Sequence, residues 1–141
     1  MALDEDQLAI LLQASLERAG ELLREDGGFL PFAGRVKRDG QIEFVQFAPE
    51  EAEPLDALLD RLGRMLAAEA RMGEILGSSL VANTRLGGEE AGEAIVVLVE
   101  TPGFCRSIAV PYRMTGGGVE LGEMTPQPAE PAVFVDAAGA G

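Results

Sequence analysis

The amino-acid sequence predicts an α+β protein, with two helices packed on a mostly antiparallel sheet in the order α-β-β-α-β-β-β-β. Two stretches repeat apolar residues at the three- and four-residue spacing of a helix. The rest divides into short apolar or alternating runs, which are typical of strands, separated by turns that contain glycine or proline. We expect both helices to cover one side of the sheet, with strong curvature or a split after the first hairpin as open alternatives for its shape.

The first helix is predicted over residues 4–26. Asp4 can cap its start, with Gln7 three residues later as in a capping box. Gly27 and Gly28 then end it. Its apolar stripe consists of Leu8, Leu11, Leu12, Leu16, Ala19, Leu22 and Leu23.

The second helix is predicted from about Pro54 to Met72. Proline suits the first helical position, where its missing N–H removes no hydrogen bond, and Gly73 is a plausible left-handed terminator. Its apolar face consists of Leu55, Leu58, Leu59, Leu62 and Leu66.

The sequence of residues 27–46 predicts a β-hairpin with its turn at Asp39-Gly40. A two-residue loop would place Val36 beside Glu43, whereas a three-residue loop pairs Val36 with Ile42. The apolar pattern therefore selects the three-residue loop, a type I turn followed by a left-handed Gly40. The same register sets Arg35 opposite Glu43 as a cross-strand ion pair.

Four further strands are predicted, at residues 78–86, 94–100, 105–112 and 119–124. The second of them is apolar on both faces, as expected of a central, covered strand. Pro111 cannot donate a hydrogen bond to a neighbouring strand, so it marks an edge or a bulge. After the Pro-rich stretch, we expect the Ala-Val-Phe-Val segment at 132–135 to dock on the core.

Length and charge limit the organisation and the partners. The 141 residues fit a single domain, predicted over 1–135, followed by a flexible Ala/Gly tail at 136–141. The net charge of −13 disfavours nucleic acid and anionic membrane surfaces, because both are polyanions. A partner with a basic surface is compatible with this charge.

The composition also restricts catalysis, and we expect no enzyme activity, cofactor or metal. The chain has no histidine, which removes the commonest general base and the usual nucleophilic triads. Cys105 is the single cysteine, so no internal disulfide forms, and we expect it to be a buried apolar residue whose neighbour Arg106 points to the opposite face. Acidic residues near the start, where a secretory signal carries positive charge, favour the cytoplasm.

An excess of large apolar side chains around the hairpin is the nearest thing to a candidate site. They exceed what one buried face of a short hairpin uses, so the surplus lies in the core, lines a pocket or forms an interface. The candidate interaction or pocket surface consists of Phe29, Phe32, Phe44, Phe47 and Tyr112.

Several short motifs resemble a family of small, uncharacterised bacterial proteins. They are the Phe-Leu-Pro-Phe-Ala-Gly run with Asp-Gly (29–40), Gly-Glu-Ile (73–75), the apolar strand ending in Glu (94–100) and Val-Pro-Tyr (110–112). The resemblance implies a bacterial origin. It carries no activity, cofactor or catalytic residue to this chain.

These observations favour a non-enzymatic protein-interaction module, acidic and self-associating as a homodimer. Its acidity suits a basic partner, as in chaperones of secreted effectors or in immunity proteins, two classes that enter by analogy. The alternative is a small-molecule binder or weak enzyme with an apolar pocket between the first helix and the Phe29–Phe47 hairpin.

Overall fold

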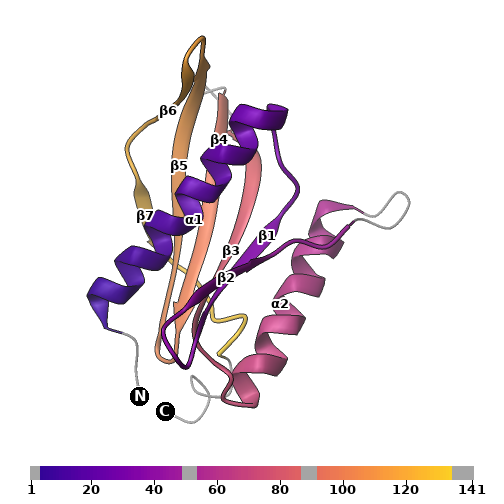
Figure 1. Cartoon of the computed structure of the whole chain (residues 1–141), viewed down its shortest axis with the longest axis vertical. Coiled ribbons are helices and arrows are strands. Elements are labelled where there is room, and N and C mark those ends of the chain that lie inside the picture. Colours follow the sequence, from indigo (N-terminus) through magenta and orange to yellow (C-terminus); the bar gives the residue numbers. More distant parts are fainter. Residues whose placement is uncertain (1–3, 49–53, 87–91, 135–141) are drawn as a thin grey trace.

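A computed structural model describes residues 4–48, 54–86 and 92–134 of the chain. It confirms the predicted α+β class: two helices accompany a seven-stranded sheet of order β2-β1-β3-β4-β5-β6, in which β7 also pairs with β5 (Figure 1). Every strand pairing is antiparallel. The elements are α1 (Glu5–Asp26), β1 (Phe32–Lys37), β2 (Ile42–Val45), α2 (Leu55–Arg71), β3 (Ile75–Leu86), β4 (Gly92–Thr101), β5 (Phe104–Thr115), β6 (Gly118–Leu121) and β7 (Thr125–Pro128).

The helix ends follow their capping residues. Asp4 and Gln7 form the predicted capping box of α1, and Gly27 ends this helix in the left-handed region at φ 76°. Pro54 is the N-cap of α2, so the helix begins one residue later than predicted. Gly73 adopts φ 72°, in agreement with its predicted role as terminator. No helix of the described ranges is long and apolar enough to cross a membrane.

The first hairpin has the predicted register. Val36 pairs with Ile42 and Arg35 with Glu43, and Gly40 adopts φ 88° in the three-residue loop. The guanidinium of Arg35 lies 3.0 Å from the Glu43 carboxylate. Pairing the apolar residues on one face therefore decided the register, as the sequence pattern indicated.

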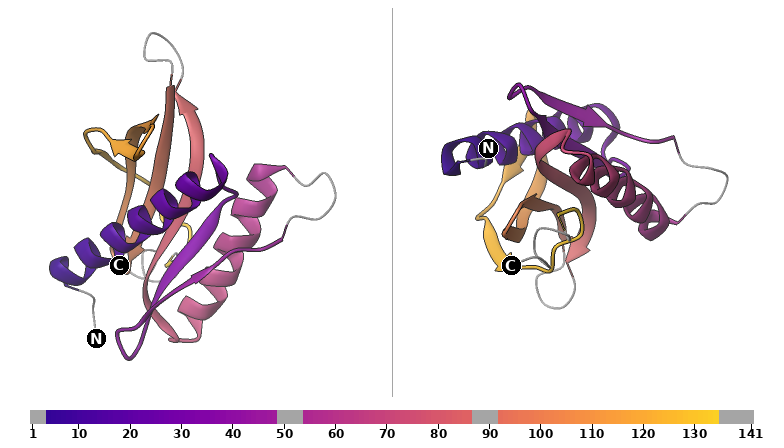
Figure 2. Two further views of the ribbon diagram at one scale, coloured as in Figure 1. Left: turned by 45° about the horizontal axis from the view of Figure 1, so that its top comes forward. Right: turned by 90° about the horizontal axis from the view of Figure 1, so that it is seen from below.

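The two helices lie on opposite faces of the sheet, so the prediction that they share one side is wrong (Figure 2). Phe32 packs in the cluster that α1 covers, whereas its neighbour Ala33 packs against Leu62 and Leu66 of α2. Because consecutive strand residues point to opposite faces, these contacts place α1 and α2 on the two sides of β1. An amphipathic stripe fixes which side of a helix is buried, but not which face of a sheet buries it.

The far border of the sheet is built from two short strands. The strand predicted over 119–124 ends at Leu121, and the Pro-rich stretch that follows contributes β7, which was not predicted. Between the two strands Gly122 donates its N–H to the carbonyl oxygen of Pro111 at 2.7 Å. Pro111 thus lies at an irregular point of the pairing, as its missing N–H requires.

The segment after β7 docks on the face that α2 covers. Val133 and Phe134 are buried at 2% and 6% exposure, in agreement with the predicted docking. The predicted tail at 136–141 lies outside the described residues.

Candidate functional site

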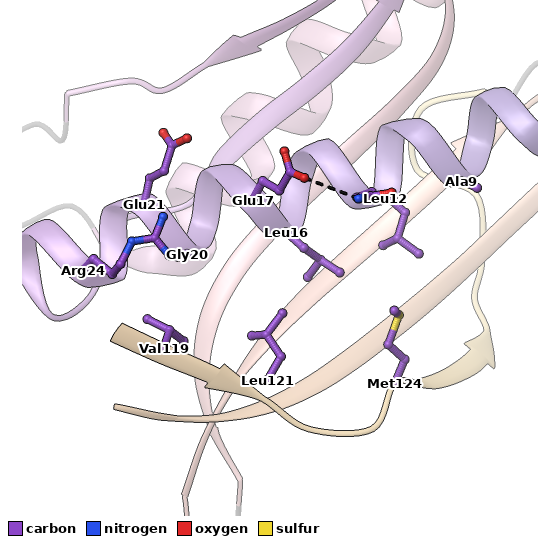
Figure 3. Close-up of a pocket in the computed structure, with 11 residues that line it drawn as sticks. Ala9, Leu12, Leu16, Glu17, Gly20, Glu21, Arg24, Val119, Leu121 and Met124 are labelled. Carbon is purple, nitrogen blue, oxygen red and sulfur yellow. Dashed lines mark hydrogen bonds between the residues drawn. The ribbon is translucent and has the colours of Figure 1, made fainter. Parts of the chain in front are cut away.

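A groove of about 700 Å³ lies between α1 and the β6 border of the sheet, and we call it the α1–β6 groove. Leu12 and Leu16 point down from the helix toward Val119, Leu121 and Met124, which point up from the strand side (Figure 3). The complete lining consists of Ala9, Leu12, Gln13, Leu16, Glu17, Gly20, Glu21, Arg24, Val119, Leu121 and Met124. The centre of the groove is therefore apolar.

Two of the three residues on the strand side of the groove, Leu121 and Met124, remain open to solvent. Leu121 is 45% exposed and Met124 is 50% exposed. Each side chain keeps about half its surface for a further contact, and burying that surface would release roughly 1 kcal/mol per residue. The groove therefore presents an apolar surface between the helix and the sheet border that is only partly buried.

The helix contributes a charged rim of two carboxylates, Glu17 and Glu21, and one cation, Arg24. Glu17 and Glu21 border the groove and project from the helix away from the strand side (Figure 3). One of them is partly neutralised, because Arg18 lies 3.2 Å from Glu21. From its cap to its last residue, α1 carries seven acids, Asp4, Glu5, Asp6, Glu17, Glu21, Glu25 and Asp26, against Arg18 and Arg24.

Sequence reasoning did not find this groove. The predicted apolar stripe of the first helix included Leu12 and Leu16, and the last predicted strand included Val119 and Leu121, but nothing in the sequence brought the two sets together as a site. The missing information was the position of the helix: α1 crosses the sheet obliquely (Figure 1), and the groove lies between it and β6. The one sequence signal was Met124, an apolar residue in a stretch of glycine, acid and proline.

The four phenylalanines of the candidate surface gather around the first hairpin. Phe32 is 1% exposed, with its ring centre 5.6 Å from that of Phe29 and 5.7 Å from that of Phe44. Phe44 is 36% exposed on the edge strand β2. Arg61 of α2 lies over the ring of Phe47, with its guanidinium carbon 4.9 Å from the ring centre. The group is thus divided between core and surface.

A hollow of about 660 Å³ lies where the alternative function placed its pocket. Phe29 and Phe47 border it together with Leu22 of α1. Its polar side chains are Asp26 and Gln46, and the Gln46 amide is already engaged, because it donates to the Leu30 carbonyl oxygen at 2.9 Å. A ligand would find aromatic surface here and few polar groups to orient it.

Tyr112, the fifth candidate residue, lies in a polar network beneath α1. Its hydroxyl donates to Glu93 at 2.9 Å and accepts from the Asn83 amide at 2.8 Å. Burial raises the pKa of Tyr112, the Asn83 hydrogen bond lowers it and Glu93 raises it. Tyr112 is 6% exposed and its hydroxyl makes two hydrogen bonds, so its contacts are those of a structural residue.

Glu100 is the most deeply buried charged residue of the described chain, at 1% exposure. Its carboxylate accepts the backbone N–H groups of Ala132, Val133 and Phe134, and the Cys105 thiol lies 3.7 Å away. Cys105 is buried as predicted, and burial raises the pKa of its thiol to about 11, with the Glu100 charge adding to the rise. A thiol with that pKa is a poor nucleophile at neutral pH.

Groups that could hold a metal ion, three or more His, Cys, Asp or Glu side chains together, do not occur within residues 4–48, 54–86 and 92–134. Comparisons with protein-family models, with curated proteins and with solved structures found no match. The resemblance drawn from short motifs therefore stays an expectation, and the function must be argued from the surface of the chain itself.

Proposed function

We propose that this chain is a non-enzymatic protein-interaction module, and that its α1–β6 groove receives an apolar segment of a basic partner protein. The observation that carries the proposal is the juxtaposition of half-exposed Leu121 and Met124 with the acidic helix α1. Apolar centres surrounded by charge are typical of protein-binding surfaces.

The edge of the sheet supports an extended partner segment. Within the described residues, β6 pairs with β5 alone, so its other side faces the groove border as an open edge. A partner strand added there would gain main-chain hydrogen bonds, and alternate side chains would enter the groove.

Charge supports a cationic partner. The chain carries a net charge of −13, and α1 with its N-cap Asp4 has an excess of five acids, seven minus two. Such a field speeds the approach of a basic protein and slows that of an acidic one. Handling of a secreted effector and inhibition of a toxin are two activities of this kind, and a cytoplasmic location belongs to the same proposal.

Self-association as a homodimer remains part of the proposal, at a different surface. Two copies meeting through the α1–β6 groove would bring two acidic α1 helices together, which like-charge repulsion opposes. Phe44 on the edge strand β2, at 36% exposure, is the better candidate for that contact. Native mass spectrometry of the purified chain at several concentrations measures the oligomeric state directly.

A fluorescent peptide of alternating leucine and lysine tests the groove. We expect it to bind at low salt, and to bind L121D and M124D at least about tenfold more weakly, since each change removes an apolar contact and adds a charge to a binding surface. M114D is the matched control, because Met114 is also exposed, at 46%, and lies in the same β5–β6 hairpin outside the groove lining. It adds the same negative charge.

The control decides between the groove and general attraction to an acidic protein. Unchanged binding by L121D and M124D, or an equal loss in M114D, would contradict the proposal. An alternating serine and lysine peptide must also bind weakly, because charge without apolar side chains cannot fill the groove.

A small-molecule function is the second candidate, and the hollow beside Phe29 and Phe47 is the observation that favours it. Native mass spectrometry of protein purified gently from its own host tests it. An added mass of some hundred daltons that is lost on denaturation, and lost in a Phe47→Ala variant, would place a ligand there. If no added mass is found, the small-molecule candidate is rejected and the protein-interaction proposal stands.

A further inference from the structure

The segment after β7 is held on the sheet like a bound peptide. The Glu100 Oε1 atom accepts the N–H of Ala132 at 2.9 Å, and Oε2 accepts those of Val133 at 2.9 Å and Phe134 at 2.6 Å. Successive backbone N–H groups that converge on one anion form a nest. Here the folded sheet supplies the anion and the segment supplies the nest.

The two side chains of this segment enter the core on the α2 face of the sheet. Val133 and Phe134 join a buried cluster to which β1, α2 and β3 each contribute residues. Its other buried members are Ala33, Leu62, Leu66 and Ile75. The segment has no regular secondary structure of its own, so its position depends on these apolar contacts and on Glu100.

The site around Glu100 would be unstable if residues 132–134 left it empty. Replacing this segment by another peptide therefore costs less free energy than removing it. Among the described residues Glu100 takes part in no ion pair, and without the segment its remaining partner is the Cys105 thiol at 3.7 Å. A buried carboxylate with so little compensation is costly. Any peptide that restores the three N–H groups removes that cost.

We propose that this face of the sheet is a peptide-binding site, which the chain's own residues 132–134 occupy in cis and which takes in trans a peptide of the same chemistry in the same bent backbone conformation. The chemistry is two consecutive bulky apolar residues and three consecutive free N–H groups. Proline is excluded from those three positions, because it lacks the N–H. In the resident segment, Pro131 stands immediately before them. The site is separate from the α1–β6 groove, which lies on the other face.

Mixed-disulfide capture tests the site on the full, unaltered chain. The Cys105 sulfur lies 3.5 Å from the Glu130 carbonyl oxygen, so the backbone of an occupant passes beside the only thiol. The probe is a synthetic peptide of residues 129–134 with cysteine in place of Glu130, activated as a thionitrobenzoate disulfide. Because burial raises the pKa of Cys105 to about 11, both captures are run at the same alkaline pH, about 10, where part of the thiol is ionised. The Cys105 thiolate attacks the peptide sulfur, a new disulfide forms and thionitrobenzoate leaves as the free thiolate, so the exchange needs no other oxidant.

The matched control peptide carries an N-methyl group at the position of Phe134, which removes the donor of the 2.6 Å hydrogen bond to Glu100. We expect capture of the unmodified peptide to be at least about tenfold faster than capture of the control, as the loss of a hydrogen bond to a charged group predicts. Intact mass spectrometry follows both reactions. Equal rates for the two peptides would overturn the proposal.

Equilibrium binding to a full-length V133S/F134S variant gives a second measurement. Weakening the resident segment should increase binding of a fluorescent 129–134 peptide by about tenfold relative to the unaltered chain, since two buried apolar side chains no longer compete. Adding Glu100→Gln to this variant should abolish the gain. If the variant keeps its circular dichroism spectrum and binds no peptide, the site does not act in trans. Should it fail to fold, the capture experiment decides alone.

Discussion

The hydroxyl of Ser79 occupies the space that a side chain on Gly34 would need. The two residues are paired across β1 and β3, and a Cβ atom on Gly34 would lie 2.5 Å from the Ser79 oxygen. That oxygen is fixed, because it is fully buried and lies 2.8 Å from the Ser15 hydroxyl of α1. The close approach of α1 to the first hairpin therefore depends on a small residue at each of the three positions.

Gly34→Ala should lower the free energy of unfolding by about 1–3 kcal/mol, as overpacking of a tight core does. Urea unfolding measures it. Part of the loss should return in G34A combined with Ser79→Ala, because the second change removes the clashing oxygen. Gly63→Ala is the control: its Cβ would meet Leu80 at an ordinary 3.8 Å inside α2, so the substitution should stabilise by roughly 0.5–1 kcal/mol.

Arg35 joins two carboxylates of unequal burial. Its guanidinium lies 2.6 Å from Glu69 of α2 and 3.0 Å from Glu43, whose side chains are 18% and 43% exposed. Arg35→Met should cost the most, about 1–3 kcal/mol, because it leaves the less exposed carboxylate without its cation. Glu43→Gln should cost less than about 1 kcal/mol, as exposed pairs do. Similar losses in the two variants, measured by thermal unfolding, would contradict this order.

Cys105 should make the protein less stable at high pH. The native pKa of about 11 exceeds the ordinary value of 9.0, so the native state holds the thiol proton more tightly than the unfolded state. The contribution is complete below pH 9 and declines as pH rises through about 11, by up to about 3 kcal/mol for a difference of 11 minus 9.0.

Cys105→Ala isolates this contribution from that of Tyr112, whose pKa is also raised. The variant should lose the part of the alkaline decline that belongs to the thiol and keep the part that belongs to the phenol. Chemical denaturation at pH 8, 9, 10 and 11 measures both chains. Parallel curves would show that the thiol does not titrate with a raised pKa.

Tyr112→Phe should cost about 1 kcal/mol, since it removes the group that links Asn83 and Glu93. The ring remains, so the buried cluster beneath α1 keeps its volume. Tyr112→Leu should cost more, because it also changes the shape of the packing. A Phe variant as unstable as the Leu variant would mean that the hydroxyl contributes far more than an ordinary hydrogen bond.

Local features of this fold were predictable from the sequence. Asp4, Gln7 and Gly27 set the ends of α1 by nearest-neighbour hydrogen bonds, and the pairing of Val36 with Ile42 fixed the hairpin register. Each of these depends on residues close together in the chain. No long-range information was needed.

Predictions of features that depend on contacts between distant residues were missing or wrong. Every residue of β7 is exposed, so no burial pattern marks it as a strand. The faces of the helices could have been predicted from Phe32 and Ala33, since two adjacent buried apolar residues require a sheet covered on both sides. Nothing in the sequence near Glu100 indicates that its partners lie in residues 132–134.

The Thr-Pro-Gln-Pro sequence of β7 limits how far this sheet can grow. Beside β5, the described border consists of β6, an interruption at residues 122–124, and then β7, in which Pro126 and Pro128 have no N–H to donate. A strand arriving from another molecule finds four residues of regular edge and then a stretch with two missing donors. Such a border can pair with a short strand of a partner molecule, but it resists the repeated strand addition from chain to chain that leads to fibres.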